Sequence, residues 1–260
     1  MPARYIAVVW SAALLAILSG AFITSGKIGL SPAQPVPSSA PHVIIASLAL
    51  LLTLALCISV PRFRLAAWLG FASLALSGAI GAMAPLTPGL IVLHAVFAHL
   101  SLVLITGAAV LSSLASTKQA EPLDPGSWTA LRPMALITPP FVLLQITMGA
   151  LYRHEIVGVM PHMLGAMIVA ILTLVVSVIL LQNFRSSREL TNSATALISI
   201  VLAQVCLGIA VFIMLLLGVG SGPIFAWLAT AHVSVGALTF VASVVTAIYV
   251  KRFIAERSVQ

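Results

Sequence analysis

Eight long stretches of the chain carry almost no charge, and each is close to the roughly 20 residues that an α-helix needs to cross a membrane. They lie at about 5–24, 42–60, 66–84, 90–114, 134–152, 160–182, 193–217 and 225–250. Only 7% of the residues are charged, whereas a soluble domain carries about 25%. In lipid a helix satisfies its own backbone hydrogen bonds. The sequence therefore predicts an all-α membrane protein with eight transmembrane helices, and it excludes a soluble domain.

The basic residues predict how these helices are oriented. If the N-terminus is cytoplasmic, ten of the twelve Lys and Arg residues lie on the cytoplasmic side, and only Lys27 and Arg153 lie outside. Such a bias follows the positive-inside rule. We therefore expect a multi-pass protein of the bilayer, in a bacterial plasma membrane, with both termini in the cytoplasm. The net charge of +7 is then a matter of topology and predicts no nucleic-acid partner.

The stretches divide into two halves of four. The longest cytoplasmic connection, 115–133, is rich in charges and turn-forming residues such as Pro125 and Gly126, which is typical of a linker. We predict an N-terminal half at 1–114 and a C-terminal half at 134–260. Each half would be a four-helix bundle, and the two bundles would be pseudo-symmetric about an axis along the membrane normal.

Four histidines lie near the starts of the even-numbered stretches, and each is followed four residues later by alanine or glycine. They are His42 with Ala46, His94 with Ala98, His162 with Ala166, and His232 with Gly236. Residues four apart share one face of a helix, so a flat ligand there would meet an imidazole beside a gap. Neutral imidazole is a common axial ligand of haem iron. Two histidines in each half therefore predict one six-coordinate haem iron per half, whereas a zinc site normally needs three or four protein ligands.

Small and amide residues accompany these histidines in the odd-numbered stretches. The glycines are Gly20, Gly78, Gly149 and Gly208. They could allow close helix packing or allow a porphyrin to approach the backbone, and the two interpretations are compatible. Gln145 and Gln204 each precede one of these glycines by four residues. Because a buried amide needs a partner, we expect them to form interhelical hydrogen bonds within the C-terminal half.

Three further residues are candidates for secondary roles. Arg153 ends the fifth stretch, and a guanidinium is a good partner for the propionate carboxylates of haem; the alternative is a solvated loop charge. His154 either supports that contact or is exposed. His99 follows His94 by five residues and points about 140° away around the helix. We interpret it as a packing residue, with iron ligation as the alternative.

Three segments together resemble the haem A synthase family of cytochrome oxidase assembly proteins. They are Leu144-Gln-Ile-Thr-Met-Gly-Ala-Leu-Tyr-Arg-His154, Pro161-His-Met-Leu-Gly-Ala166 and Ala231-His-Val-Ser-Val-Gly-Ala237. The resemblance extends to the layout of all eight stretches and is most specific in the C-terminal half. It implies that His162 and His232 hold haem b. It also implies that His42 and His94 line the catalytic site, where a ring methyl group of haem O is oxidised to the formyl group of haem A. Haem O, haem O synthase and a membrane electron donor are the implied partners.

Two positions of the first outer loop differ from the family pattern. Ser39 stands where a glutamate is typical, and Val43 stands where an arginine follows the histidine. A carboxylate there would be a candidate for proton handling. Two alternatives therefore stay open beside the enzyme: a non-catalytic haem-carrying assembly factor or b-type membrane cytochrome, and a small transporter. A transporter would need broken helices and a polar site near the midplane, and the apolar stretches contain few charges.

Overall fold

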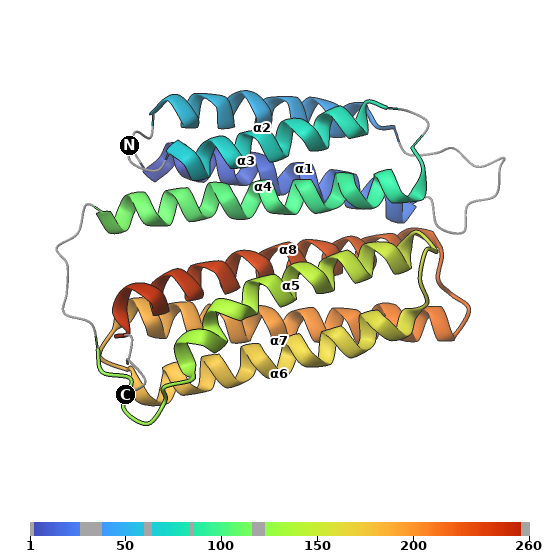
Figure 1. Ribbon diagram of the computed structural model, residues 1–260. Coiled ribbons are helices and arrows are strands. Elements are labelled where there is room, and N and C mark those ends of the chain that lie inside the picture. The colour runs from blue at the N-terminus through green and yellow to red at the C-terminus, as the bar shows by residue number, and fades with distance from the viewer. Residues whose placement is uncertain (1–2, 27–37, 60–63, 84–85, 116–122, 256–260) are drawn as a thin grey trace.

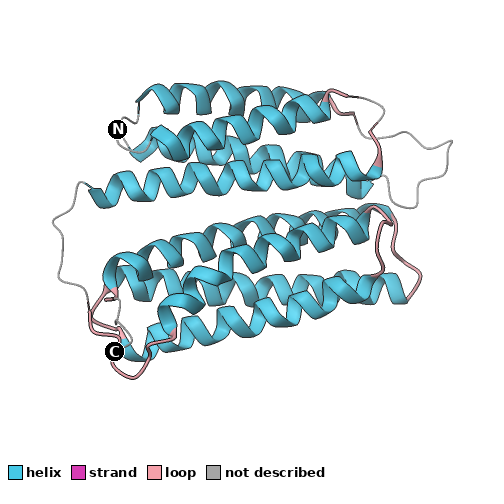
Figure 2. Ribbon diagram, viewed as in Figure 1, coloured by secondary structure: helices cyan, strands magenta, loops and turns pink. Residues whose placement is uncertain are grey.

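The computed structural model describes residues 3–26, 38–59, 64–83, 86–115 and 123–255. Within these ranges the chain forms eight α-helices connected by turns and loops (Figure 2). They are α1 (Ala3–Gly26), α2 (Ala40–Ser59), α3 (Arg64–Gly81), α4 (Pro88–Ala115), α5 (Leu131–Arg153), α6 (Val159–Asn183), α7 (Arg188–Leu216) and α8 (Gly222–Phe253).

Seven of these helices are long and apolar enough to cross a membrane, and α3, with 18 residues, is shorter. The prediction of an all-α protein with membrane-type helices is therefore confirmed. Each helix coincides with one predicted stretch, although most helices extend beyond it. For example, α5 begins at Leu131, three residues before the predicted start. Several of the extensions carry charged residues, such as Arg132, Arg153 and Lys251, which a search for apolar stretches does not include.

The helices are arranged in two groups, α1–α4 and α5–α8, which lie one beside the other (Figure 1). We call them the N-terminal group and the C-terminal group. Helices α1 and α4 of the first group pack against α8 of the second, and α4 also contacts α5. One buried cluster joins residues of both groups: Val9, Leu56, Leu102, Ile105 and Ala237. All even-numbered helices begin at the same end of the molecule (Figure 1), so the N-terminal turns of the histidine-bearing helices lie together.

Large apolar side chains cover much of the outer surface. On α6 alone, Met163, Leu164, Met167, Ile168 and Ile171 are exposed. Such a surface is far more apolar than that of a soluble monomer. Most of the buried hydroxyls bond to their own helices, as when Thr173 donates to the carbonyl of Val169 at 2.7 Å, and a few bond to a neighbouring helix, as when Ser73 donates to the carbonyl of Phe97. Apolar outer faces with internally satisfied polar groups indicate a multi-pass membrane protein.

The described end of the predicted linker is attached to the C-terminal group. The Leu123 N–H donates to the carbonyl of Phe253, and the Ala255 N–H donates to the carbonyl of Leu123, at 2.7 and 2.9 Å. The charged linker residues Lys118 and Glu121 and the outer-loop residue Lys27 lie outside the described residues. The part of the linker around Leu123 therefore lies against the C-terminal end of α8.

Candidate functional site

The four histidines of the even-numbered helices meet as two pairs, one in each group of helices. His42 and His162 lie in the first turn of α2 and α6, as expected, whereas α4 and α8 begin six and ten residues before His94 and His232. In the first pair, the ring centroids of His42 and His94 are 6.1 Å apart and the ring planes are inclined at 75°. In the second pair, His162 and His232 are 6.3 Å apart and inclined at 86°. The two pairs thus have nearly the same geometry, although their residues lie far apart in the sequence.

This separation is close to that of two imidazoles on opposite sides of one metal ion. An imidazole nitrogen binds a first-row transition metal at about 2 Å, and the ring centre lies about 1 Å further back, so the two centres would be about 6 Å apart. Among the described residues, His, Cys, Asp and Glu form no group of three or more that could hold a metal ion. Two nitrogen donors per site suit axial ligation of a porphyrin iron, whose other four ligands come from the macrocycle.

Each imidazole ring lies against a glycine of the preceding helix. A Cβ atom built on that glycine would lie only 2.8–3.1 Å from the Cε1 atom of the ring, closer than normal van der Waals contact. The contacts are Gly20 with His42, Gly81 with His94, Gly149 with His162, and Gly208 with His232. The glycines therefore allow the imidazoles to approach the helix backbone, which gives Gly149 and Gly208 a defined place beside the second pair.

In α3 the glycine beside the histidine is Gly81, three residues after Gly78. A Cβ atom on Gly78 would have no neighbour within 4 Å. The dipeptide Gly78-Ala79 resembles Gly20-Ala21 in sequence, but it lies nearly one helical turn before the point where α3 meets His94. Gly81, rather than Gly78, is therefore the glycine of α3 that admits an imidazole.

Oxygen atoms fix the protonation of both rings in the first pair. The Ser19 hydroxyl donates to the carbonyl of Ala16 and therefore accepts from Nδ1 of His42, each at 3.0 Å. Nδ1 of His94 donates to the carbonyl of Ser77 at 2.8 Å, and the Ser77 hydroxyl donates back to the carbonyl of His94 at 2.9 Å. Because a neutral imidazole carries one hydrogen, Nε2 of both rings retains a lone pair. This is the tautomer that a metal-binding histidine needs.

Glutamine amides replace these oxygen atoms beside the second pair. Gln145 Nε2 donates to the carbonyl of His162 at 2.8 Å and lies 2.9 Å from Nδ1 of the same ring. Gln204 Nε2 lies 3.4 Å from Nε2 of His232. The expected interhelical bonds of both glutamines are therefore present, and both lead to the histidines. If the side-chain amide turns by 180°, it presents the acceptor Oε1 to the ring in place of the donor Nε2. Each glutamine can therefore hydrogen-bond the facing ring nitrogen whether or not that nitrogen carries a hydrogen.

The small residues after the second pair make room for these amides. A Cβ on Gly165 would collide with Oε1 of Gln145, and a Cβ on Gly236 would lie 3.2 Å from Nε2 of Gln204. The gap at Gly236 was predicted from its position four residues after His232, but glutamine rather than open space lies there. On α6 the equivalent residue is Gly165, one position before the predicted Ala166.

Several buried polar atoms around the second pair have no hydrogen-bond partner in the described structure. They are Oε1 of Gln145, Oε1 of Gln204, Nδ1 of His232 and Nε of Arg153. Buried polar groups are nearly always hydrogen-bonded. Their concentration around one pair of histidines indicates a site that is completed by a bound polar group.

Arg153 and His154 lie where α5 ends. Arg153 is half-buried and its Nη2 donates to the carbonyl of Ala21 at 3.1 Å and to the Ser25 hydroxyl. It is thus not a solvated loop charge. His154 is the C-cap residue of α5. Burial, and then the positive charge of Arg153, lower its pKa below the usual value for histidine. His154 is therefore neutral near pH 7 and lies beside the cation.

His99 does not join either pair. It is buried in α4, and its Nδ1 donates to the carbonyl of Ala95 at 2.7 Å. Tyr152, which sequence reasoning missed, has its ring stacked on that of His162 with centroids 6.5 Å apart and planes inclined at 14°. Ser19 and Ser77 were missed as well. The one available signal was position: Ser77 precedes Gly81 by four residues, as Gln145 precedes Gly149.

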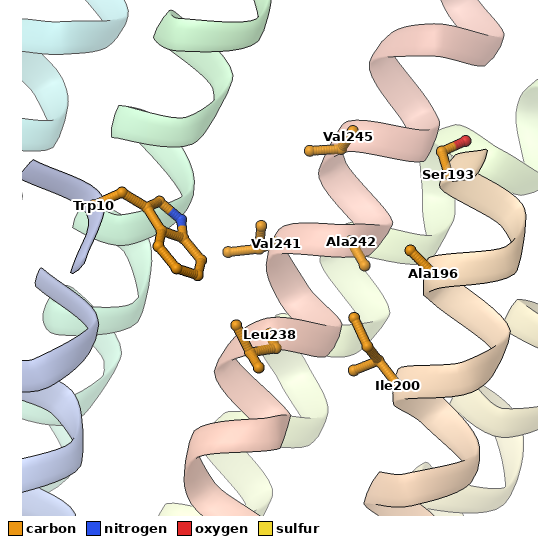
Figure 3. Close-up of a pocket in the computed structure, with 8 residues that line it drawn as sticks. All are labelled: Trp10, Ser193, Ala196, Ile200, Leu238, Val241, Ala242 and Val245. Atoms are coloured by element: carbon orange, nitrogen blue, oxygen red, sulfur yellow. The ribbon is translucent and has the colours of Figure 1, made fainter. Parts of the chain in front are cut away.

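An apolar cavity of about 270 Å³ lies away from the histidines, between α1, α7 and α8 (Figure 3). Its lining includes Trp10, Ile200, Leu238 and Val241, and its polar groups are the Ser193 hydroxyl and the indole N–H of Trp10. With no ionisable group it offers no chemistry, so the histidine pairs remain the candidate site.

No family model and no curated protein sequence matches the chain.

Proposed function

We propose that this protein is a haem A synthase-like membrane oxidoreductase with two haem sites. The observation that carries the proposal is the meeting of the four histidines of the even-numbered helices as two pairs, with ring centroids 6.1 and 6.3 Å apart. His162 and His232 would be the axial ligands of haem b, and His42 and His94 would hold the substrate, haem O. All eight helices would cross a bacterial plasma membrane, as two pseudo-symmetric four-helix halves with both termini in the cytoplasm.

The residues at each site suit a porphyrin iron. In the first pair both Nε2 lone pairs are available, because both Nδ1 atoms donate to oxygen. In the second pair, buried polar atoms without partners surround the rings. A bound haem b supplies one-electron redox chemistry. The described residues contribute the nitrogen ligands, the glycines that admit the rings, and the hydrogen bonds that orient them.

The proposed reaction exchanges two hydrogens of a methyl group for one oxygen, which is a four-electron oxidation of the porphyrin substituent. With dioxygen as the oxidant and a membrane donor as the source of electrons it balances as R–CH3 + 2 O2 + 4 H+ + 4 e− → R–CHO + 3 H2O. The protein therefore needs an electron-transfer partner in the membrane, and it needs haem O from a haem O synthase. His42 and His94 would orient haem O so that one particular methyl group reacts. Positioning of this kind is a large part of enzymatic rate enhancement.

A non-catalytic haem protein is the second candidate, and the first outer loop favours it. Ser39, directly before α2, is exposed and stands where the family has a glutamate, while Val43 stands where it has an arginine. Such a protein would bind haem through the same two pairs of histidines. It would act as a haem-carrying assembly factor or as a b-type membrane cytochrome.

Co-expression with a haem O synthase separates these candidates. The protein is purified in detergent, its porphyrins are extracted and separated, and its spectrum is recorded before and after dithionite. We expect bound haem b together with haem A. Haem b without haem A would favour the non-catalytic protein, and the lack of any bound porphyrin would exclude both.

Ser19 and Ser77 provide a matched test of the first pair. Ser19→Ala removes the acceptor for Nδ1 of His42, whereas Ser77→Ala leaves the acceptor for Nδ1 of His94, a backbone carbonyl, in place. Loss of such a supporting hydrogen bond typically weakens a metal site about 10–100-fold. We therefore expect Ser19→Ala to weaken haem binding at the first pair by about that factor and Ser77→Ala to weaken it far less. Titration of both variants with haem, in a His162→Ala background, measures the difference.

A further inference from the structure

Arg153 brings a positive charge into the contact between the two groups of helices. From the end of α5, its Nη2 donates to the carbonyl of Ala21 and the hydroxyl of Ser25, both in α1. Its Nε is buried and has no partner. The recorded partners of this guanidinium are therefore neutral, and a partly buried cation without an anion is unfavourable.

Among the residues that the structure describes, no acidic side chain neutralises this charge. The nearest in sequence, Glu155, is exposed in the loop after α5. Asp124 and Glu189 lie before α5 and at the start of α7, which is the opposite end of the molecule from the α5–α6 loop (Figure 1). An anion at Arg153 would thus come from a bound molecule.

One buried hydroxyl, that of Ser25, binds the guanidinium, and a second, that of Thr230, lies against the first. Ser25 and Thr230 are each 1% exposed. The Ser25 hydroxyl donates to the carbonyl of Ala21 and so accepts from Arg153. The Thr230 hydroxyl lies 3.3 Å from that of Ser25 and donates to the carbonyl of Ala226. Three helices, α1, α5 and α8, therefore fix the arginine and leave its Nε–H for a ligand.

This position lies beside the second pair of histidines. Arg153 follows Gly149 by four residues, and Gly149 is the glycine against which His162 lies. The charge of Arg153 is also close enough to His232 for a direct electrostatic interaction. A ligand held between the two rings would therefore have its edge within reach of the guanidinium.

We infer that Arg153, held by Ser25, is the binding site for a carboxylate side chain of the porphyrin that His162 and His232 bind. The inference rests on the proposed function and extends it, because the site includes α1 of the N-terminal group. A guanidinium forms two parallel hydrogen bonds with a carboxylate. Since α1 also holds this arginine, the carboxylate site is complete only when the two groups of helices are packed together.

Haem and its dimethyl ester, in which both carboxylates are blocked, provide the test. Haem-free protein in lipid nanodiscs is titrated with each, and binding is followed by the Soret absorption. We expect wild type to bind haem about 10–100-fold more tightly than the ester, as is typical for a charge-assisted pair. Arg153→Gln should remove this preference by weakening haem binding while leaving ester binding unchanged. Arg185→Gln, which replaces an exposed arginine, should preserve it.

Each other outcome has a distinct meaning. Equal binding of haem and ester by wild type would overturn the carboxylate site but not the proposed histidine sites. It would also indicate that any anion at Arg153 is a free ion or a lipid headgroup. A preference that survives in Arg153→Gln would overturn it too. Binding of neither compound would remove the proposed function itself. If Arg153→Gln does not fold, Arg153→Lys keeps the charge without the paired hydrogen bonds and should retain only part of the preference.

Discussion

Replacing His162 or His232 by alanine is expected to abolish the spectrum of a six-coordinate haem b. The two rings are the nitrogen donors of the second pair, 6.3 Å apart, and the loss of either leaves one axial position without a protein ligand. We expect the α-band of the dithionite-reduced protein to disappear and the bound haem to fall at least about 100-fold in affinity. Absorption spectra of the purified variants, with and without dithionite, measure both effects.

His99 and His154 are the matched controls for this prediction. His99 bonds to its own helix and His154 caps α5, so neither contacts the second pair. His99→Gln and His154→Ala should keep the six-coordinate spectrum. If His162→Ala and His232→Ala keep it as well, while one of the controls loses it, the iron ligands have been assigned to the wrong residues.

The helices and the histidine pairs followed from the sequence for simple physical reasons. An apolar stretch of membrane length specifies a helix without reference to its neighbours. The order of the helices then specifies which ends share one side of the membrane, so histidines at the starts of the even-numbered helices were expected to meet. Ring spacing and ring orientation could not be predicted, because they depend on how closely each ring lies against the facing glycine.

The residues that support the histidines were harder to find. Gly78-Ala79 and Gly81-Ala82 both match the Gly-Ala dipeptides of α1 and α5, so the dipeptide does not say which glycine faces His94, and helix rotation decides between them. A better signal was available: a polar side chain four residues before the glycine, as in Ser77 with Gly81 and Gln145 with Gly149. The acceptor for His94 is the backbone carbonyl of Ser77, and a backbone atom has no signature in the sequence.

Arg153 shows a different limit. Its sequence position indicated a cation near His162, and its chemistry indicated a carboxylate partner. Its hydrogen bonds, however, reach Ala21 and Ser25, which lie 132 and 128 residues away in the chain. Contacts between the two groups of helices depend on how α1 packs against α8, and the composition of either helix does not reveal this packing.

Replacing either histidine of the first pair, His42 or His94, is expected to reduce the formation of haem A strongly. Both rings of this pair have Nδ1 bonded to oxygen and Nε2 free, so the site is prepared for a ligand whose iron bonds to both. Replacing His42 or His94 by alanine removes one of these bonds, and haem O would no longer be held in a single orientation. A misplacement of about 1 Å can cost a factor of about 100 in rate. We expect formation of haem A to fall by at least that factor.

Haem b bound by the second pair should be retained in the same variants, because His162 and His232 belong to the other group of helices. Porphyrins extracted after co-expression with a haem O synthase would then show haem b at the wild-type level, unreacted haem O and little or no haem A. This combination separates a lost catalytic site from a misfolded protein, in which both haems would disappear. Haem A at the wild-type level in His42→Ala and His94→Ala would mean that the first pair does not hold the substrate. The reaction would then have to take place in the C-terminal group, beside His162 and His232.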